Sequence, residues 1–512
     1  MHARLLACWL PLVASCAAPV ATTQAQSLPS SPCPAASSAP SPVAPVVAGP
    51  PAFDPAPWLA DFHQLLGELS SHYANLEAAR EQRHMDLPAL AARTEAELRD
   101  ARTADAARRA LQSFLRAFGD GHLALAAAPE SAPSPSSEPA PAARPLCDRL
   151  GYGHQRVKEG VDFTLVPGFE PSADADAVDM PGGVLRLPSG VRLGVVRIAL
   201  FMTEIHPALC EPARLSLGLA DDAACDDECG FRVELAVSNL LLAALDRRLA
   251  SLRKAGAAGV VVDLTGNGGG SDWVDPAARE MTALPLRAPR MLFPRHPHWS
   301  ENLKQMLHDV EADVAGVNDA RRSTLASAAS VLRAAIADAE RPCDTSGLWT
   351  KGGPAPACSM LVRTAYYTSG LLPYAKSGAF AGLHAEELLF KPGQYRYREG
   401  ANRLPVVVLV DEYTASSAEL FTAMLRDNGA AMVAGAPTVG AGCGYTNGGI
   451  PTVLRNSGLK VRVPDCVRLR ADGSDEVAGI VPDVLLPFTS RDSPYQRAAV
   501  AREGLERAWK RR

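Results

Sequence analysis

The sequence lacks the features that are typical of proteins that bind nucleic acids or nucleotides. Its formal net charge is only -5, with 51 basic and 56 acidic residues interspersed, and it contains no basic stripe or aromatic platform. No spaced Gly-x-Gly-x-x-Gly motif occurs, and no glycine-rich turn ends in Lys-Ser or Lys-Thr. We therefore expect neither a nucleic-acid partner nor a nucleotide site.

The N-terminus lacks an apolar run long enough to cross a bilayer. A short basic start is followed by an apolar core of ten residues, Leu5 to Ala14, which is typical of a secretion signal. Val13-Ala14-Ser15-Cys16 resembles a bacterial lipobox, and this predicts a signal peptide over residues 1–16 with Cys16 lipidated. Ordinary cleavage farther on, near Ala25, is the alternative. Either reading places the protein outside the cytoplasm, and the first predicts a lipid anchor on the periplasmic side of a bacterial cell envelope.

Charge is absent from residues 17–52, where Ala, Pro and Ser dominate. Such a segment has too few apolar side chains to form a core, and we expect a tether over residues 17–53. As an extended Pro-rich spacer it would reach roughly 100 Å. This length suits a connection between a membrane and a folded enzyme.

Cysteine usage agrees with export. Outside the signal and the tether, the chain has an even number of cysteines, which in an exported protein indicates disulfides: Cys147, Cys210, Cys225, Cys229, Cys343, Cys358, Cys443 and Cys466. Cys343 with Cys358 and Cys443 with Cys466 are plausible local pairs, but the full connectivity does not follow from the sequence. For Cys225 and Cys229 zinc is the rival interpretation, although no matching Cys or His pair follows at finger-like spacing.

A serine lies at a predicted strand-to-helix turn. The apolar run Val406–Val410 is followed by Thr414-Ala415-Ser416-Ser417-Ala418-Glu419, which opens a segment with helical character. At such a turn a hydroxyl is exposed beside unpaired amides, and the helix dipole favours an oxyanion there by roughly 0.3–1 kcal/mol. Ser416 is therefore a candidate nucleophile. A plain helix-capping role is the alternative.

A glycine-rich loop follows a second apolar strand. Gly259–Leu264 predicts a buried strand, and Gly266-Asn267-Gly268-Gly269-Gly270 comes directly after it. Consecutive glycines allow backbone amides to approach a ligand closely, so we expect the amides of Gly269 and Ser417 to form an oxyanion hole. A simple turn is the alternative.

The third element is Phe118-Gly119-Asp120-Gly121-His122-Leu123, at the end of a long amphipathic stretch. Together with the motifs Asp263-Leu264-Thr265-Gly266-Asn267-Gly268-Gly269 and Thr414-Ala415-Ser416-x-x-Glu419, it resembles the S41 family of serine peptidases. Thr265 stands where that family usually has Arg. Segments near residues 72–87, 193–198, 435–440 and 479–483 extend the resemblance over about residues 55–490.

The resemblance implies one of two catalytic bases. Processing peptidases of the family use a Lys 25 residues after the nucleophile, but Ala441 occupies that position and the chain has only eight Lys. The tricorn-like members use His with a Glu that orients it, and these roles fall on His122 and Glu476. An imidazole accepts a hydroxyl proton near neutral pH while a carboxylate fixes its tautomer. We therefore predict a triad of Ser416, His122 and Glu476, with Asp475 as the substitute if the register shifts by one.

The resemblance also implies an α/β fold with a crotonase-like or Clp-protease-like ββα core. Alternating predicted strands and helices from residue 191 onward fit this core. We expect the following domains: an N-terminal helical domain at 54–127, a linker at 128–146, a peptidase core at 147–490 with a helical insertion at 275–355, and a C-terminal helix at 491–512. The segment from Cys147 to Leu187, which precedes the first predicted core strand, is too short for a PDZ domain.

These observations predict an extracytoplasmic serine endopeptidase that acts on polypeptides and requires no metal or organic cofactor. The main alternative is a noncatalytic S41-fold module that binds an apolar ligand or a peptide, since retinoid-binding proteins resemble the family without being peptidases. A cell-envelope scaffold that holds partners through the insertion is a third interpretation.

Overall fold

The computed structural model describes residues 53–126, 144–174, 176–341, 343–445, 450, 452–489 and 491–512. All of them belong to one compact unit, Ala52–Arg512. The expected signal peptide, Cys16 and most of the expected tether lie outside the described residues. The same holds for most of the expected linker at 128–146.

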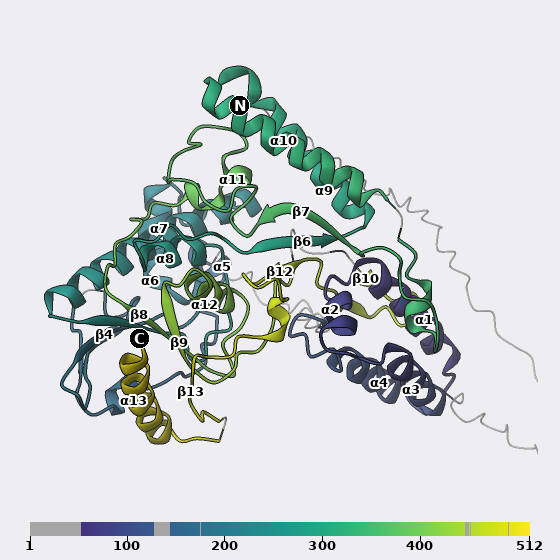
Figure 1. Cartoon of the computed structure of the whole chain (residues 1–512), viewed down its shortest axis with the longest axis horizontal. Coiled ribbons are helices and arrows are strands. Elements are labelled where there is room, and N and C mark those ends of the chain that lie inside the picture. The colour runs from purple at the N-terminus through teal and green to yellow at the C-terminus, as the bar shows by residue number, and fades with distance from the viewer. Residues whose placement is uncertain are drawn as a thin grey trace, which may run out of the picture. The chain divides into compact units, whose positions relative to one another are not determined.

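The largest sheet among the described residues has seven strands, of which β4, β8, β9 and β13 are labelled in Figure 1. Its order is β13-β9-β8-β5-β4-β3-β2, and the five strands from β13 to β4 are parallel, whereas β4, β3 and β2 are antiparallel. The strands are β2 (Phe169–Pro171), β3 (Gly182–Arg186), β4 (Arg192–Arg197), β5 (Gly259–Asp263), β8 (Val406–Val410), β9 (Ala431–Gly435) and β13 (Val484–Leu485).

Both faces of this sheet are buried at its centre, where β8 is apolar throughout and β5 is apolar from Val260 to Val262. Val408 and Val262 pack on one face against α7 (Asp227–Lys254), α8 (Val274–Glu280) and α12 (Ser417–Asp427). Val407 and Val261 pack on the other face, against α13 (Pro494–Arg511). A continuous apolar run is typical of a parallel strand that is covered on both sides. In β8 the end of the apolar run marks the end of the strand, and β5 ends at Asp263, directly after its apolar run.

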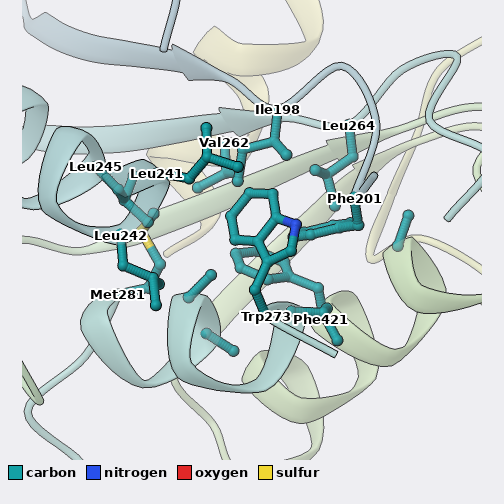
Figure 2. Packing of buried hydrophobic residues seen from close by; sticks show 14 of the residues in the cluster. Ile198, Phe201, Leu241, Leu242, Leu245, Val262, Leu264, Trp273, Met281 and Phe421 are labelled. Carbon is teal, nitrogen blue, oxygen red and sulfur yellow. The ribbon is translucent and has the colours of Figure 1, made fainter. Parts of the chain in front are cut away.

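Three aromatic side chains anchor α8 and α12 to the sheet (Figure 2). Trp273, just before α8, lies 4.8 Å from Phe201 between ring centroids, and Phe421 of α12 lies 5.6 Å from Phe201. All three are fully buried. The helix that begins at the candidate nucleophile is therefore held by a dense apolar contact.

The N-terminal region is helical, as the periodicity predicts. It consists of α1 (Ala56–His72), α2 (Leu76–Glu81), α3 (Leu87–Asp100) and α4 (Ala104–Arg116). Its core includes Leu454 and Val461 from the C-terminal part of the chain. Strand β1 (Ala124–Leu125) pairs with β11 (Lys460–Arg462), which also pairs with β10 (Thr452–Val453). The helical region thus packs on a hairpin that lies after the nucleophile in the sequence.

The segment expected to be a helical insertion is only partly helical. Helices α9 (Pro297–Ala312) and α10 (Asp319–Ala339) are present, but Arg290–Pro294 forms strand β6. Strand β6 pairs antiparallel with β7 (Leu361–Tyr367) and with β12 (Val467–Leu469). The expected helical insertion at 275–355 thus also contains a strand, which the sequence analysis overlooked because it is a short apolar run whose strand partners lie far along the chain.

Short elements complete the described fold. The remaining α-helices are α5 (Leu146–Arg149), α6 (Pro207–Ser216) and α11 (Glu386–Leu389), and 3-10 turns lie at Phe163–Leu165, Thr203–Ile205, Val314–Gly316, Ser346–Trp349, Lys391–Gln394 and Glu476–Ala478. Within the described ranges, none of the helices combines the length and apolar character needed to cross a bilayer.

Four disulfides join the eight cysteines of the folded part. The two local pairs expected from the sequence, Cys343–Cys358 and Cys443–Cys466, are confirmed. Cys225 pairs with Cys229, so the rival zinc interpretation does not apply to them in this structure. The fourth bond joins Cys147 to Cys210.

Candidate active site

Ser416 occupies the turn between β8 and α12. Its backbone has φ 54° and ψ -116°, a conformation that residues with a side chain rarely adopt. The N–H of Ser416 donates to Oε2 of Glu419 at 2.9 Å, so the first turn of α12 holds this conformation. A strained serine between a buried strand and a helix is the geometry of a nucleophile elbow.

The glycine-rich loop lies directly against this turn. A Cβ atom on Gly269 would lie 2.7 Å from Cβ of Ser416 and 2.9 Å from N of Ser417, so only glycine allows this approach. The N–H of Ala415 donates to the carbonyl of Asn267 at 3.0 Å, which fastens the loop to the turn. The two motifs that are distant in sequence are therefore brought together as predicted from the resemblance.

The two expected oxyanion donors differ in their present hydrogen bonding. Ser417 is the first residue of α12, a position whose N–H has no acceptor within the helix. The N–H of Gly269, in contrast, donates to Oδ1 of Asn267 at 2.9 Å. Gly269 can donate to a ligand only if this internal bond is shared or broken.

His122 is held by the loop that follows β9. Its Nδ1 lies 2.6 Å from the carbonyl oxygen of Ala441, and its ring packs edge-on against Tyr445 at 5.5 Å. A Cβ on Gly444 would lie 3.0 Å from the imidazole, so this glycine makes room for the ring. Because a carbonyl can only accept, Nδ1 carries the proton and Nε2 is left as a proton acceptor.

The turn that carries His122 is fixed by the buried Asp120. Oδ1 of Asp120 accepts the N–H of His122 at 2.9 Å. Its Oδ2 accepts from Tyr73 at 3.0 Å and from Asn75 at 2.7 Å. Tyr73 and Asn75 of the N-terminal helical region therefore hold the Asp-Gly-His motif in place. These contacts determine where the imidazole lies.

Glu476 is buried near the nucleophile, but its partner is an arginine. It forms an ion pair with Nε of Arg468, and Arg468 donates to the carbonyl of Ser416 at 2.9 Å. Burial raises the pKa of Glu476 to about 7, against the opposing effect of Arg468. Among the hydrogen bonds of the described residues, none joins Glu476 or Ser416 to His122. His122 contacts the segment 440–442 directly, and Glu419 and Arg468 link Ser416 to the same segment.

Asp475, the substitute orienting residue, is also buried. Its Oδ1 accepts from the N–H of Val477 at 2.9 Å, and within the part of the chain that the structure describes its Oδ2 has no hydrogen-bond partner. Burial, followed by the nearby charges of Asp120 and Glu476, raises its pKa to about 7. Asp120, which holds the turn of His122, is thus one of the charges that raise the pKa of Asp475.

Glu419 is a site residue whose role the sequence analysis did not assign. Besides the N–H of Ser416, its carboxylate accepts from the N–H groups of Gly440 and Ala441 at 2.7 and 2.9 Å. It therefore joins the nucleophile turn to the segment that holds His122. Its place in the Thr-Ala-Ser-x-x-Glu motif was the available signal. Arg468 carried no comparable signal.

The threonine that replaces the usual arginine of the glycine motif has a defined environment. Oγ1 of Thr265 donates to Oδ1 of Asp263 at 2.6 Å, and Arg197 of β4 donates to Oδ2 of Asp263 at 2.7 Å. Arg197 also donates to the carbonyl of Thr265 at 3.0 Å. A guanidinium from the neighbouring strand thus neutralises the buried carboxylate at the base of the glycine loop.

An α/β fold with a serine at an elbow, glycines packed against it and a histidine with its Nε2 available defines a site of the serine-hydrolase type. Residues 241–486 match the model of peptidase family S41. This match, over just under half of the chain, supports the resemblance to S41 serine peptidases that the motifs predicted.

Curated relatives match a smaller part of the chain. An uncharacterised protein of Chlamydia muridarum is 34% identical over 92 residues, and protein CPj1016/CpB1054 of Chlamydia pneumoniae is 38% identical over 95 residues. Each match covers 18% of this chain and 15% of the relative, so the chain spans about a seventh of the length of these relatives.

Solved structures confirm the fold class. Mature CPAF complexed with lactacystin has a TM-score of 0.53 at 15% identity, with 89% of this chain and 98% of that chain covered. A second structure of mature CPAF has a TM-score of 0.51 at 15% identity, with 88% and 96% covered. At this identity the likeness shows the mixed α/β fold of S41 proteases, which agrees with the fold predicted from the sequence.

Proposed function

We propose that this protein is an extracytoplasmic serine endopeptidase that hydrolyses polypeptides with Ser416 as nucleophile and His122 as base. One observation carries the proposal: the contact between Nδ1 of His122 and the carbonyl of Ala441 leaves Nε2 of that ring as a proton acceptor. The strained turn at Ser416 supports the same reading, because strain of this kind is concentrated at functional sites.

The reaction follows from these groups. The Oγ of Ser416 attacks the scissile carbonyl carbon while its proton passes to Nε2 of His122, directly or through one water. The N–H of Ser417 stabilises the oxyanion, and Gly269 is the second donor once its N–H turns from Asn267 to the substrate. The amine leaves with the proton from Nε2, and water then hydrolyses the acyl-serine with His122 again as base.

The carbonyl of Ala441 takes over part of the role expected of Glu476. A backbone carbonyl fixes the imidazole tautomer as a carboxylate does, although without its negative charge. Glu476 then contributes through Arg468, which contacts the nucleophile's own carbonyl.

Labelling with a fluorophosphonate probe tests the function. We expect the wild type to react at Ser416, and the Ser416→Ala and His122→Ala variants to lose the reaction. Matched controls are Ser323→Ala and His63→Ala, since both side chains are exposed on helices outside the site. Loss of labelling in the controls, or no labelling of the wild type under conditions where a known serine peptidase reacts, would contradict the proposal.

A noncatalytic binding function is favoured by one separate observation. A cavity of about 810 Å³ lies beside β2 and β4, with apolar walls that include Val161, Phe163, Phe169 and Val195. Lys158 borders it, with Nζ 3.7 Å from the ring centroid of Tyr413. A fluorescent fatty acid that binds a wild type unreactive toward the fluorophosphonate would support this second function.

The location and anchoring of the protein are part of the proposal. The four disulfides are typical of a chain that folds in an oxidising compartment. Lipidation at Cys16, which lies outside the described residues, would attach the enzyme to the periplasmic side of the envelope. We expect metabolic labelling with an alkynyl fatty acid to mark the wild type and not Cys16→Ala, and recovery of both in the soluble periplasmic fraction would contradict the anchor.

A further inference from the structure

Arg468 connects three parts of the candidate site. It lies on β12, is 5% exposed, and donates from Nη2 to the carbonyls of Ser416 at 2.9 Å and Gly442 at 2.7 Å. Its Nε donates to Glu476, which is itself buried. The guanidinium thus joins the nucleophile turn to the segment next to Ala441, whose carbonyl holds His122.

The peptide groups of Ser416 are held from both sides. Glu419 accepts its N–H and Arg468 donates to its carbonyl, and both side chains also contact residues of the segment 440–442. A left-handed backbone at a residue with a side chain costs of order 1–3 kcal/mol and persists only where its surroundings over-determine it. Two buried charged side chains provide this constraint.

We propose that Arg468 is a positioning residue that sets the geometry between Ser416 and His122, with Glu476 as the carboxylate that orients its guanidinium. This inference rests on the proposed peptidase function and deepens it. It gives Glu476 an indirect role through Arg468 in place of direct contact with the imidazole.

The chemistry of arginine suits this role. A planar guanidinium has donors in fixed directions, so it can hold two carbonyls and a carboxylate at defined angles. A lysine at the same position keeps the charge, but its single ammonium group cannot reproduce the fork. Arg468→Lys therefore keeps the positive charge and removes the fork of donors. Arg468→Met removes both the charge and the donors.

Arg470 provides a matched control. It lies two residues farther along the chain, is also largely buried, and forms a two-point ion pair with Asp427 at 2.8 and 2.5 Å. None of its hydrogen bonds among the described residues reaches Ser416 or the segment 440–442. Arg470→Lys therefore tests loss of a buried arginine pair away from the nucleophile.

The experiment compares full-length variants with a fluorogenic peptide and with a fluorophosphonate that titrates active sites. For Arg468→Lys we expect kcat per titrated site to fall about 10- to 100-fold with KM within about twofold, because small misplacement of reacting groups costs this much. The labelling rate constant falls in parallel. Arg470→Lys keeps kcat per site within about threefold of the wild type.

Two outcomes overturn the inference. Equal kcat per site in Arg468→Lys and Arg470→Lys shows that the contact does not position the nucleophile. Fewer titratable sites with normal kcat per site in Arg468→Lys shows a purely structural role.

Crystal structures of the variants test the positioning role of Arg468 without a measurement of catalytic activity. In Arg468→Met we expect Ser416 to leave its positive φ and the contact from Nδ1 of His122 to Ala441 to lengthen, whereas both are kept in Arg470→Met. Unchanged geometry in Arg468→Met overturns the inference. A wild type that does not react with the probe would overturn the peptidase function instead, and the crystallographic comparison would still test Arg468.

Discussion

At the scale of single residues, the closeness of Gly269 to Ser416 has a direct consequence. Gly269 has φ +101° and leaves no room for a Cβ, whereas a Cβ on Gly268 would meet only Leu200, at 3.9 Å. We expect Gly269→Ala to abolish fluorophosphonate labelling and to lower the free energy of unfolding by roughly 1–3 kcal/mol.

Gly268→Ala is the control for this change. It should keep most of the labelling rate, since the added methyl group has space. Labelling rates and urea unfolding of the two variants decide the prediction, and similar behaviour of both would argue against tight packing at the elbow.

A buried carboxyl makes stability depend on pH. Burial raises the pKa of Asp475 to about 7, well above its value of about 3.8 in the unfolded chain. Between these values the folded state binds more protons than the unfolded state, so this group's stabilising contribution is lost as pH rises toward 7. We expect the wild type to lose of order a few kcal/mol between pH 4 and pH 8 from this group.

In Asp475→Asn the side chain stays neutral between pH 4 and pH 8. The variant therefore lacks the pH-dependent contribution of this carboxyl to stability. The difference in unfolding free energy between the wild type and Asp475→Asn should therefore change with pH, with the variant gaining relative stability as pH rises. Urea unfolding at several pH values measures it, and parallel curves would contradict a raised pKa.

The sequence motifs suggested the candidate reacting residues, but the residues that support them could not be predicted. Ser416 and His122 lie in short motifs whose residue types follow from the chemistry. Arg468 interacts with the carbonyl of Ser416 and with Glu476, and neither contact leaves a local pattern. Such contacts depend on how distant segments pack, which a single sequence does not display.

At the scale of elements, local patterns predicted β8 at the bounds that the structure has, and they predicted a helix where α12 begins. An unbroken apolar run marks the strand, and the serine-rich turn marks the helix start. Strand β6 was missed because it is short and lies between helices. Its partner β12 lies far along the chain, so its strand character comes from pairing.

The disulfide Cys443–Cys466 should support activity more than the other short-range bonds. Cys443 follows the segment that holds His122, and Cys466 directly precedes β12, which carries Arg468. We expect Cys443→Ala with Cys466→Ala to lower the unfolding free energy by about 3 kcal/mol and to reduce kcat per titrated site.

Cys225→Ala with Cys229→Ala is the comparison pair. That bond closes a span of only 4 residues at the start of α7, so its removal should cost less stability and leave kcat per site unchanged. Urea unfolding and active-site titration measure both effects. An equal loss of kcat in the two double variants would refute a specific role for Cys443–Cys466.

At the scale of the whole molecule, one buried carboxylate ties the N-terminal helices to the hairpin β10–β11. Asp61 of α1 accepts from the N–H groups of Asn456 and Ser457 at 2.8 and 2.7 Å, and from Nδ2 of Asn456 at 2.8 Å. Asp61→Ala would leave these donors unpaired, at about 1–3 kcal/mol for each one that stays buried. We expect a loss of a few kcal/mol in urea unfolding.

Asp86→Ala is the matched change at an exposed position. Among the described residues, the carboxylate of Asp86 accepts only from the N–H of Ala89, as the cap of α3, so a loss of about 1 kcal/mol is expected. An equal loss of unfolding free energy in Asp61→Ala and Asp86→Ala would show that the buried contacts of Asp61 stabilise the fold no more than an exposed helix cap does.

The broad architecture could be predicted because the motifs follow each other in the order known for the family. The predicted domain boundaries stay predictions. What the sequence did not reveal is that the helical region shares its core with Leu454 and Val461. In this shared core, segments that are far apart along the chain pack together. Such packing becomes visible only from long-range contacts in the structure.

The residues that contact His122 also set the order in which the candidate site can form while the chain is being made. The groups that hold the imidazole, Ala441, Gly444 and Tyr445, are made long after the histidine itself, and Arg468 later still. A partly synthesised chain therefore contains the motif of Ser416 before it can form the complete candidate site. For the proposed peptidase, this means that the site can assemble only after the segment that carries Arg468 has been made.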